Sequence, residues 1–124
     1  MTSILIIEDQ PDIRRLIRWA LEFEHYAIHE AANGAAGLEA ARNLKPDLIL
    51  LDVMMPGDLD GLQVCAAVKA DPALAHVPVV LLTARAQDSD REAGQRVGAN
   101  AYLVKPFSPL ALIDTVNSLI VPGP

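Results

Sequence analysis

The chain has 124 residues, enough for one domain with its own core, and its single cysteine excludes an internal disulfide. A formal net charge of −6 argues against a nucleic-acid-binding surface, and no apolar run approaches the ~20 residues of a membrane helix. Because an apolar run begins directly after Met1, no room is left for a signal peptide. Together with the lone cysteine, this predicts a cytoplasmic protein.

Short apolar runs alternate with helical patterns along the whole chain. The first helix is expected to begin at Pro11, and the clearest run, residues 48–52, has the uninterrupted apolar character of a strand buried on both faces. Strands are predicted at residues 3–7, 26–30, 48–52, 77–82 and 101–104. Helices are predicted at residues 11–22, 35–44, 62–70, 88–97 and 109–120. This alternation predicts an α/β fold, a doubly wound parallel sheet with helices on both faces.

Helical periodicity also predicts which side chains face the core. The helix at residues 88–97 carries few large apolar residues, so we expect it to be the most mobile regular element. Ser108 and Gly98 are the expected N-cap of the last helix and C-cap of the fourth. Trp19 is expected to be half-buried. The side chains expected in the core include Leu16, Leu44, Cys65 and Leu110.

Polar residues follow four of the five apolar runs. They are Glu8 and Asp9, Asp52, Thr83, and Lys105. Because the carboxyl ends of parallel strands lie at one edge of a sheet, we expect these side chains to meet. Converging carboxylates repel one another, and a hard cation such as Mg²⁺ relieves that repulsion. A phosphoryl group bound there would share its oxygens with Mg²⁺, Lys105 and Thr83, while Asp52 would act as the nucleophile and become an acyl phosphate.

Other interpretations of single residues are weaker. Asp52 alone would suit a strand-end carboxylate that caps a loop, and Tyr102 would suit a static core position. His25 and His29 have a spacing that suits a metal pair, but a helix end lies between them and no third ligand is near. Neither they nor His76 are expected to bind metal.

Together these motifs resemble the receiver domain of the response regulators of two-component signalling, over essentially the whole chain. The matching motifs are Glu8-Asp9, LLD at 50–52, MMPG at 54–57, DG at 60–61, LLTA at 81–84, and Tyr102 with Lys105-Pro106-Phe107.

The resemblance implies a flavodoxin-like (βα)5 sandwich with sheet order 2-1-3-4-5, formed by residues 1–120, and residues 121–124 as a tail or the start of a linker. It implies that Asp52 receives a phosphoryl group from a histidine kinase or a phosphotransfer protein. Such a domain catalyses only its own phosphorylation and dephosphorylation. The output surface would be the fourth helix, the fifth strand and the fifth helix, which signal to an effector domain or protein.

The resemblance also assigns roles to residues. Asp9, Asp52 and the backbone carbonyl of Met54 would bind Mg²⁺ directly, with Mn²⁺ as an alternative ion, and Glu8 would bind mainly through water. Lys105 would pair with the phosphoryl group, and its bond to Pro106 would be cis. On phosphorylation, Thr83 would move toward the phosphate and Tyr102 would turn inward, while the small Ala84 would keep the phosphorylation site open.

Three features depart from the common pattern of the family. Glu8 stands where aspartate is more usual, and the segment between Asp52 and Gly61 has one extra residue near Asp58. The family's transcription factors that dimerise through the fourth helix and fifth strand usually have an acidic pair just before the tyrosine and an arginine in the last helix. This chain has Asn100 and Ala101 in place of the acidic pair and Thr115 in place of the arginine. The expected state is therefore a monomer or a weak, phosphorylation-dependent dimer.

Three other classes of function fit parts of the pattern. A Mg²⁺-dependent phosphohydrolase also uses an aspartyl phosphate, but usually has a second aspartate where this chain has Met54. A flavodoxin-like cofactor binder would want a Ser/Thr/Gly-rich loop in place of Glu8-Asp9-Gln10. A receiver-like interaction module that takes no phosphate would not need the acidic cluster or Lys105.

Overall fold

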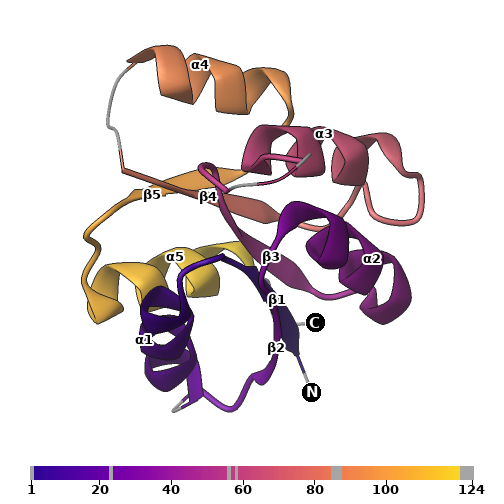
Figure 1. Cartoon of the computed structure of the whole chain (residues 1–124). Coiled ribbons are helices and arrows are strands. Elements are labelled where there is room, and N and C mark those ends of the chain that lie inside the picture. Colours follow the sequence, from indigo (N-terminus) through magenta and orange to yellow (C-terminus); the bar gives the residue numbers. More distant parts are fainter. Residues whose placement is uncertain (1, 23, 56, 58, 85–87, 121–124) are drawn as a thin grey trace.

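The computed structural model describes residues 2–22, 24–55, 57, 59–84 and 88–120, and of residues 88–91 it describes the backbone alone. Strands and helices alternate along this part of the chain (Figure 1). The strands are β1 (Ser3–Ile7), β2 (Ala27–Ala31), β3 (Leu48–Asp52), β4 (Val79–Thr83) and β5 (Ala101–Val104). The helices are α1 (Pro11–Glu22), α2 (Gly34–Leu44), α3 (Gly61–Ala70), α4 (Asp88–Arg96) and α5 (Pro109–Leu119). The predicted alternation is confirmed, with boundaries that differ by one or two residues.

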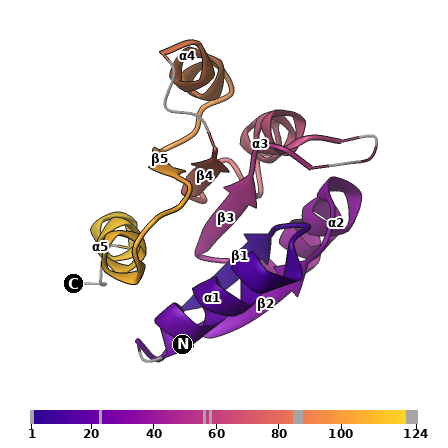
Figure 2. The same cartoon turned by 60° about the vertical axis from the view of Figure 1, so that its left-hand side comes forward.

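The strands form one parallel sheet in the order β2-β1-β3-β4-β5, which confirms the predicted fold. Helices α1 and α5 cover one face and α2 and α3 cover the other, as the turned view shows (Figure 2). The chain leaves β1 toward β2 on one side and returns to β3 on the other. The carboxyl ends of β1 and β3 therefore form a topological switch point, where open α/β sheets bind ligands.

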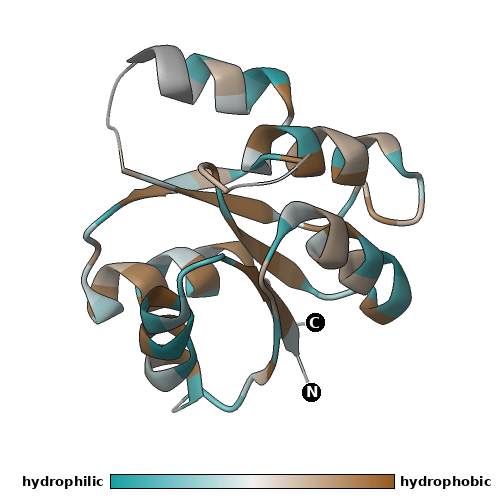
Figure 3. Ribbon diagram, viewed as in Figure 1, coloured by the Kyte–Doolittle hydropathy of each residue, from teal (hydrophilic) through white to brown (hydrophobic). Residues whose placement is uncertain are grey.

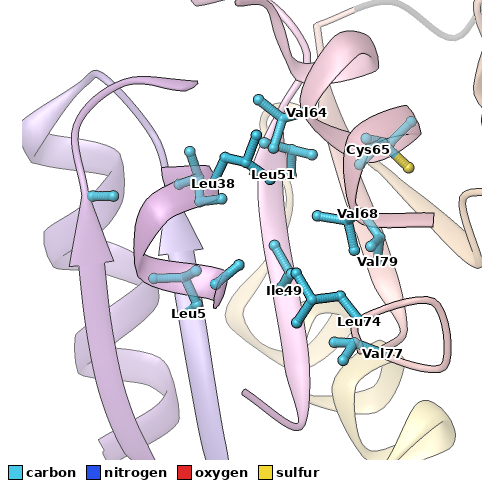
Figure 4. Close-up of a cluster of buried hydrophobic side chains, with 14 of the residues drawn as sticks. Leu5, Leu38, Ile49, Leu51, Val64, Cys65, Val68, Leu74, Val77 and Val79 are labelled. Atoms are coloured by element: carbon cyan, nitrogen blue, oxygen red, sulfur yellow. The ribbon is translucent and has the colours of Figure 1, made fainter. Parts of the chain in front are cut away.

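The sheet separates two hydrophobic cores. Alternate side chains of β1 and β3 point to opposite faces, and all of those at residues 4–7 and 48–51 are fully buried. The hydropathy colouring shows the central strands as the most apolar part of the chain (Figure 3). The core beneath α2 and α3 includes Leu5, Leu38, Ile49, Leu51, Val64 and Val68 (Figure 4). The core beneath α1 and α5 includes Ile4, Ile6, Ile17, Leu50, Leu112 and Val116.

Local sequence sets the helix ends. Ser108 Oγ accepts a hydrogen bond from the Ala111 backbone N–H at 3.0 Å, which confirms the predicted N-cap of α5. Asp60 and Gln63 form a reciprocal capping box at the start of α3. Gly98 follows α4 with a φ of +88°, a backbone conformation that glycine adopts without a steric penalty, as its predicted capping role requires.

Several core assignments made from periodicity are wrong. Leu16, Leu44 and Leu110 are 39%, 41% and 67% exposed, and Trp19 is 57% exposed and not half-buried. Periodicity identifies the apolar side of a helix but does not say whether a neighbouring element covers it. Cys65, in contrast, is fully buried in the core beneath α3, as predicted. Within the described ranges, no helix is long and apolar enough to cross a membrane.

Candidate functional site

The predicted polar residues lie at the carboxyl edge of the sheet. Asp52 is the last residue of β3, Thr83 is the last residue of β4, and Glu8 directly follows β1. Glu8 and Asp52 are buried, and so is Thr83. The Lys105 backbone N–H donates to the Thr83 carbonyl at 2.7 Å, so the loop after β5 begins beside the end of β4. The expectation that these strand ends meet is therefore met by the structure.

Lys105 links two of the carboxylates. Its Nζ donates to Glu8 Oε1 at 3.0 Å and to Asp52 Oδ1 at 3.1 Å. The Lys105 side chain is 18% exposed, whereas Glu8 is fully buried. Burial lowers the pKa of Lys105, but the hydrogen bonds and charges of Glu8 and Asp52 outweigh it, and the net pKa is raised. The ammonium is therefore held in its charged form between the two acids.

The carboxylates form a compact acidic cluster. Glu8, Asp9 and Asp52 each offer one oxygen, and these oxygens lie within 4.8 Å of one another. Burial, and then the hydrogen bond and charge of Asp52, raise the pKa of Glu8 to about 7 despite Lys105. Burial and Asp52 also raise the pKa of Asp9. The repulsion between these carboxylates is unfavourable unless a further cation binds among them.

One orphaned oxygen tests whether a metal ion suits this cluster. Glu8 Oε2 is buried, and it has no hydrogen-bond partner within the described part of the chain. A buried carboxylate oxygen without a partner is costly, and a hard divalent cation with oxygen ligands would satisfy it. The donor set is thus compatible with a divalent metal. The other oxygen, Oε1, contacts Lys105 Nζ directly within the protein interior.

An open cavity of about 460 Å³ lies beside Asp52. The Met54 backbone N–H donates to Asp52 Oδ1 at 3.3 Å, while the Met54 side chain is 68% exposed at the cavity rim. The peptide bond between Lys105 and Pro106 is cis. The cavity is lined by Gln10, Ile13, Leu16, Asp52, Met54, Ala84, Lys105, Pro106 and Phe107. A group that entered from solvent would reach the Asp52 carboxylate past this mostly apolar wall.

Tyr102 lies on β5, half-buried against the core beneath α2 and α3. A Cβ placed on Gly94 of α4 would overlap the Tyr102 ring, so α4 packs directly on it. Two predicted features cannot be located: Asp58, in the longer loop, and residues 121–124 lie outside the described residues. His29 and His76 are not part of the acidic cluster.

The comparison with known families decides the identity of this arrangement. A family model described as "Response regulator receiver domain" matches residues 4–117. The chain belongs to this family. The resemblance drawn from the strand-end motifs is therefore confirmed.

Relatives of the receiver domain agree in sequence and in structure. The transcriptional regulatory proteins ResD of Bacillus subtilis and SrrA of Staphylococcus aureus are 42% and 39% identical over 96% and 95% of this chain. The aligned region is only 48% and 47% of those proteins, so the chain spans about half their length. The chemotaxis protein CheY4 of Vibrio cholerae superposes with a TM-score of 0.91 at 30% identity, over 96% of this chain and 98% of that one. A putative response regulator from Chloroflexus aurantiacus also gives 0.91, at 32% identity, over 96% and 97%.

The raised pKa of Glu8 predicts how the stability of the receiver domain depends on pH. The folded pKa of about 7 exceeds the ordinary value of 4.5, so the folded state holds more protons between these pH values. The contribution of Glu8 to the free energy of unfolding should therefore be fully present below pH 4.5 and should fall by on the order of 3 kcal/mol as the pH rises through 7. The raised pKa of Asp9 adds a change of the same sign.

Urea unfolding at pH 5, 6, 7 and 8 with a chelator present measures this slope. Glu8→Gln is the control, because glutamine fills the same space and does not titrate. The variant should lose most of the slope, and saturating Mg²⁺ should flatten it in the wild type. A slope of unchanged size in Glu8→Gln would contradict the assignment to Glu8.

One contact of the site was not found from the sequence. Arg14 of α1 donates from Nη1 to the Glu8 backbone carbonyl at 2.6 Å. In the sequence Arg14 is one of three arginines on the polar side of α1, with Arg15 and Arg18, and nothing distinguishes it from them. Helical periodicity places a residue on one side of a helix but does not indicate a contact with a particular carbonyl.

Proposed function

We propose that this receiver domain is a switch operated by phosphorylation of Asp52. The observation that carries the proposal is the environment of that carboxylate: buried at the end of β3, within 3.1 Å of Lys105 Nζ, and beside two further acids and an open cavity. Surface carboxylates that cap loops lack such partners. In a receiver domain, this set suits a nucleophile and the groups that stabilise the charge of an incoming phosphoryl group.

The donor we propose is a phosphohistidine of a sensor kinase or a phosphotransfer protein. An Asp52 oxygen attacks phosphorus in line with the bond to the imidazole nitrogen. That P–N bond breaks, the imidazole keeps the electron pair, and an acyl phosphate forms on Asp52. Lys105 would pair with the phosphoryl oxygens, and Thr83 would donate a hydrogen bond to them. The small Ala84 at the cavity wall leaves room for the group.

The divalent ion that we propose for the acidic cluster is Mg²⁺, with Mn²⁺ as an alternative. Asp9, Asp52 and the Met54 carbonyl would hold it directly, and Glu8 would contribute mainly through water. When bound, such an ion neutralises charge on the phosphoryl oxygens and the carboxylates. Lys105, which lies beside Asp52, would present its ammonium to the phosphoryl group.

The output surface that we propose is α4, β5 and α5. Phosphorylation would draw Thr83 toward the phosphate and Tyr102 inward, and Gly94 would pass that movement to α4, since it lies against the Tyr102 ring. Among the described side chains of α4, Glu92, Gln95 and Arg96 are exposed. The expectation that α4 is the most mobile helix stays a prediction, which hydrogen exchange would measure.

The wider setting also remains proposed. We infer that residues 1–120 form the phosphoacceptor domain and residues 121–124 a tail or the start of a linker. The relatives ResD and SrrA are named as transcriptional regulators, which supports a downstream effector that acts on transcription. The net charge of −6 makes direct nucleic-acid binding by this domain unfavourable. A cytoplasmic monomer, or a weak dimer formed on phosphorylation, fits these features.

The proposed function is tested by chemical phosphorylation. Acetyl phosphate with Mg²⁺ should add the mass of one phosphoryl group to the intact wild-type protein. Asp52→Asn removes the nucleophile and should take no label, and the wild type with chelator should label far more slowly. No label on the wild type would refute the proposal, and equal labelling of Asp52→Asn would refute the choice of residue. Sustained release of phosphate from many small phosphoesters would favour a phosphohydrolase instead.

A further inference from the structure

We propose that Arg14 is a positioning residue of the acidic site, where it fixes the peptide group that joins Glu8 to Asp9. This inference rests on the proposed function, because it concerns the metal and phosphoryl site described above. It assigns a role to a residue of α1 that belongs to neither the acidic cluster nor the wall of the cavity.

The first step of the argument is the contact itself. Arg14 Nη1 lies 2.6 Å from the Glu8 carbonyl oxygen, and the Arg14 side chain is only 19% exposed. Hydrogen bonds from a charged donor are shorter and stronger than neutral ones, and partial burial strengthens this one further. A guanidinium so placed restricts the orientation of that carbonyl.

The second step concerns the peptide group to which the Glu8 carbonyl belongs. The peptide group of the Glu8 carbonyl lies between the α-carbons of Glu8 and Asp9, and both residues belong to the acidic cluster. The direction of this carbonyl depends on ψ of Glu8 and φ of Asp9, the two torsion angles that together set how the side chains of Glu8 and Asp9 are directed relative to each other. The other side of Glu8 is already fixed, because its backbone N–H donates to the Ala31 carbonyl at 3.1 Å. With Arg14 bound, the backbone of Glu8 is held at both of its polar groups.

The third step is that Arg14 is itself held in place. Its Nε contacts Glu30 Oε1 at 3.2 Å, and Arg18 Nε contacts the second oxygen, Oε2, at 2.7 Å. Arg18 Nη2 also donates to the Ile28 carbonyl at 3.3 Å. The carboxylate of Glu30 on β2 is therefore shared by two guanidinium groups of α1, and one of them reaches onward to the metal site. Such outer partners commonly orient metal ligands.

A purely structural role would also explain these bonds, since they tie α1 to β2. The two roles predict different results. A tie affects only the free energy of unfolding, whereas a positioning residue also changes the affinity of folded protein for a metal ion. Loss of an outer partner typically weakens metal binding about 10–100-fold.

The experiment compares Arg14→Met with Arg15→Met, which removes the neighbouring guanidinium on the same helix. Arg15 is 80% exposed, and among the described residues its one ion pair is a long contact of 4.0 Å with Asp12. The dissociation constant for Mg²⁺ is measured by calorimetry on folded protein, at a temperature well below each unfolding transition. Arg14→Met should weaken Mg²⁺ binding about tenfold or more, and Arg15→Met should leave it within about twofold.

Two milder variants keep the test valid if Arg14→Met folds poorly. Arg14→Lys retains the positive charge but lacks the planar guanidinium, which bonds two acceptors at once. Glu30→Gln weakens the ion pair that holds this guanidinium in place. Both should give intermediate affinities. In the metal-free protein, the ¹³C chemical shift of the Glu8 carbonyl should move in each variant and stay unchanged in Arg15→Met.

The possible failures are distinguishable. If the wild type binds neither Mg²⁺ nor a phosphoryl group, the proposed function fails. If the wild type binds Mg²⁺ and the three variants at Arg14 and Glu30 bind it as tightly, while their stability falls, then Arg14 is a structural tie and this inference alone is overturned.

Discussion

Gly61→Ala is expected to lower the free energy of unfolding by about 3 kcal/mol, because the added methyl group has no space. A Cβ on Gly61 would overlap the carbonyl oxygen of Asp52 and lie 2.7 Å from the α-carbon of Val53. Both are backbone atoms and cannot turn aside like the end of a side chain. The gain in helix propensity from glycine to alanine is about 1 kcal/mol at most, so the steric cost decides the sign.

The change has a second consequence, because the nearest backbone atoms belong to Asp52, the residue proposed to accept the phosphoryl group, and to Val53 after it. To accept the methyl group, the start of α3 and the end of β3 must move apart. This movement displaces Asp52 relative to the start of α3. We therefore expect slower labelling of Asp52 by acetyl phosphate in the fraction that folds. Urea unfolding gives the stability, and intact mass gives the label.

Ala66→Ser is the matched control for Gly61→Ala. It also adds one heavy atom to α3, but at an exposed position. Its free energy of unfolding should stay within about 0.5 kcal/mol of the wild type. A Gly61→Ala protein as stable as the wild type would show that the close approach of α3 to β3 can relax without cost.

Lys105→Met is the second change with a large expected effect. Methionine fills much of the same volume but removes the ammonium that lies 3.0 Å and 3.1 Å from Glu8 and Asp52. Removal of one partner from a buried ion pair commonly costs 3–5 kcal/mol, and Lys105 is partly exposed, so we expect about 3 kcal/mol in metal-free protein at pH 8. The loss should shrink at pH 5, because there Glu8 is protonated and needs no counterion.

Saturating Mg²⁺ should also restore part of this loss, since a divalent ion supplies the positive charge that the lysine gave. Lys45→Met serves as the control, because Lys45 is an exposed lysine at the end of α2. Its unfolding should change little at either pH. If Lys105→Met lost the same stability at pH 5 and pH 8, the ammonium would not act through the charge of Glu8.

The fold was predictable because each strand carries its own signal. Residues 48–52 read as a strand buried on both faces, and the structure buries all five of them. Polar residues at the strand ends then had to meet, since parallel strands share one carboxyl edge. The sheet order followed from the resemblance to receiver domains, because apolar runs specify strands but not which strands are neighbours.

The details that escaped prediction depend on distances between elements. The direct contact between Glu8 and Lys105 is one such detail, because only the packed structure brings the ends of β1 and β5 to that distance. Arg14 looks like its neighbours until the path of β1 brings the Glu8 carbonyl to it. The exposure of Leu110 similarly depends on whether a neighbouring element covers its side of α5, which the periodicity of one helix does not tell.

The division of the interior by the sheet bears on how this chain tolerates sequence change. Val68 of α3 and Val116 of α5 belong to different hydrophobic cores. Effects of substitutions at such separated sites usually add, so each layer of helices can be redesigned, or can diverge in evolution, without repacking the other. The ends of β1 and β3 lack this freedom, because Glu8 follows β1, Asp52 ends β3, and alternate side chains of both strands enter both cores. New surfaces can arise on either side of this domain while its chemistry stays fixed.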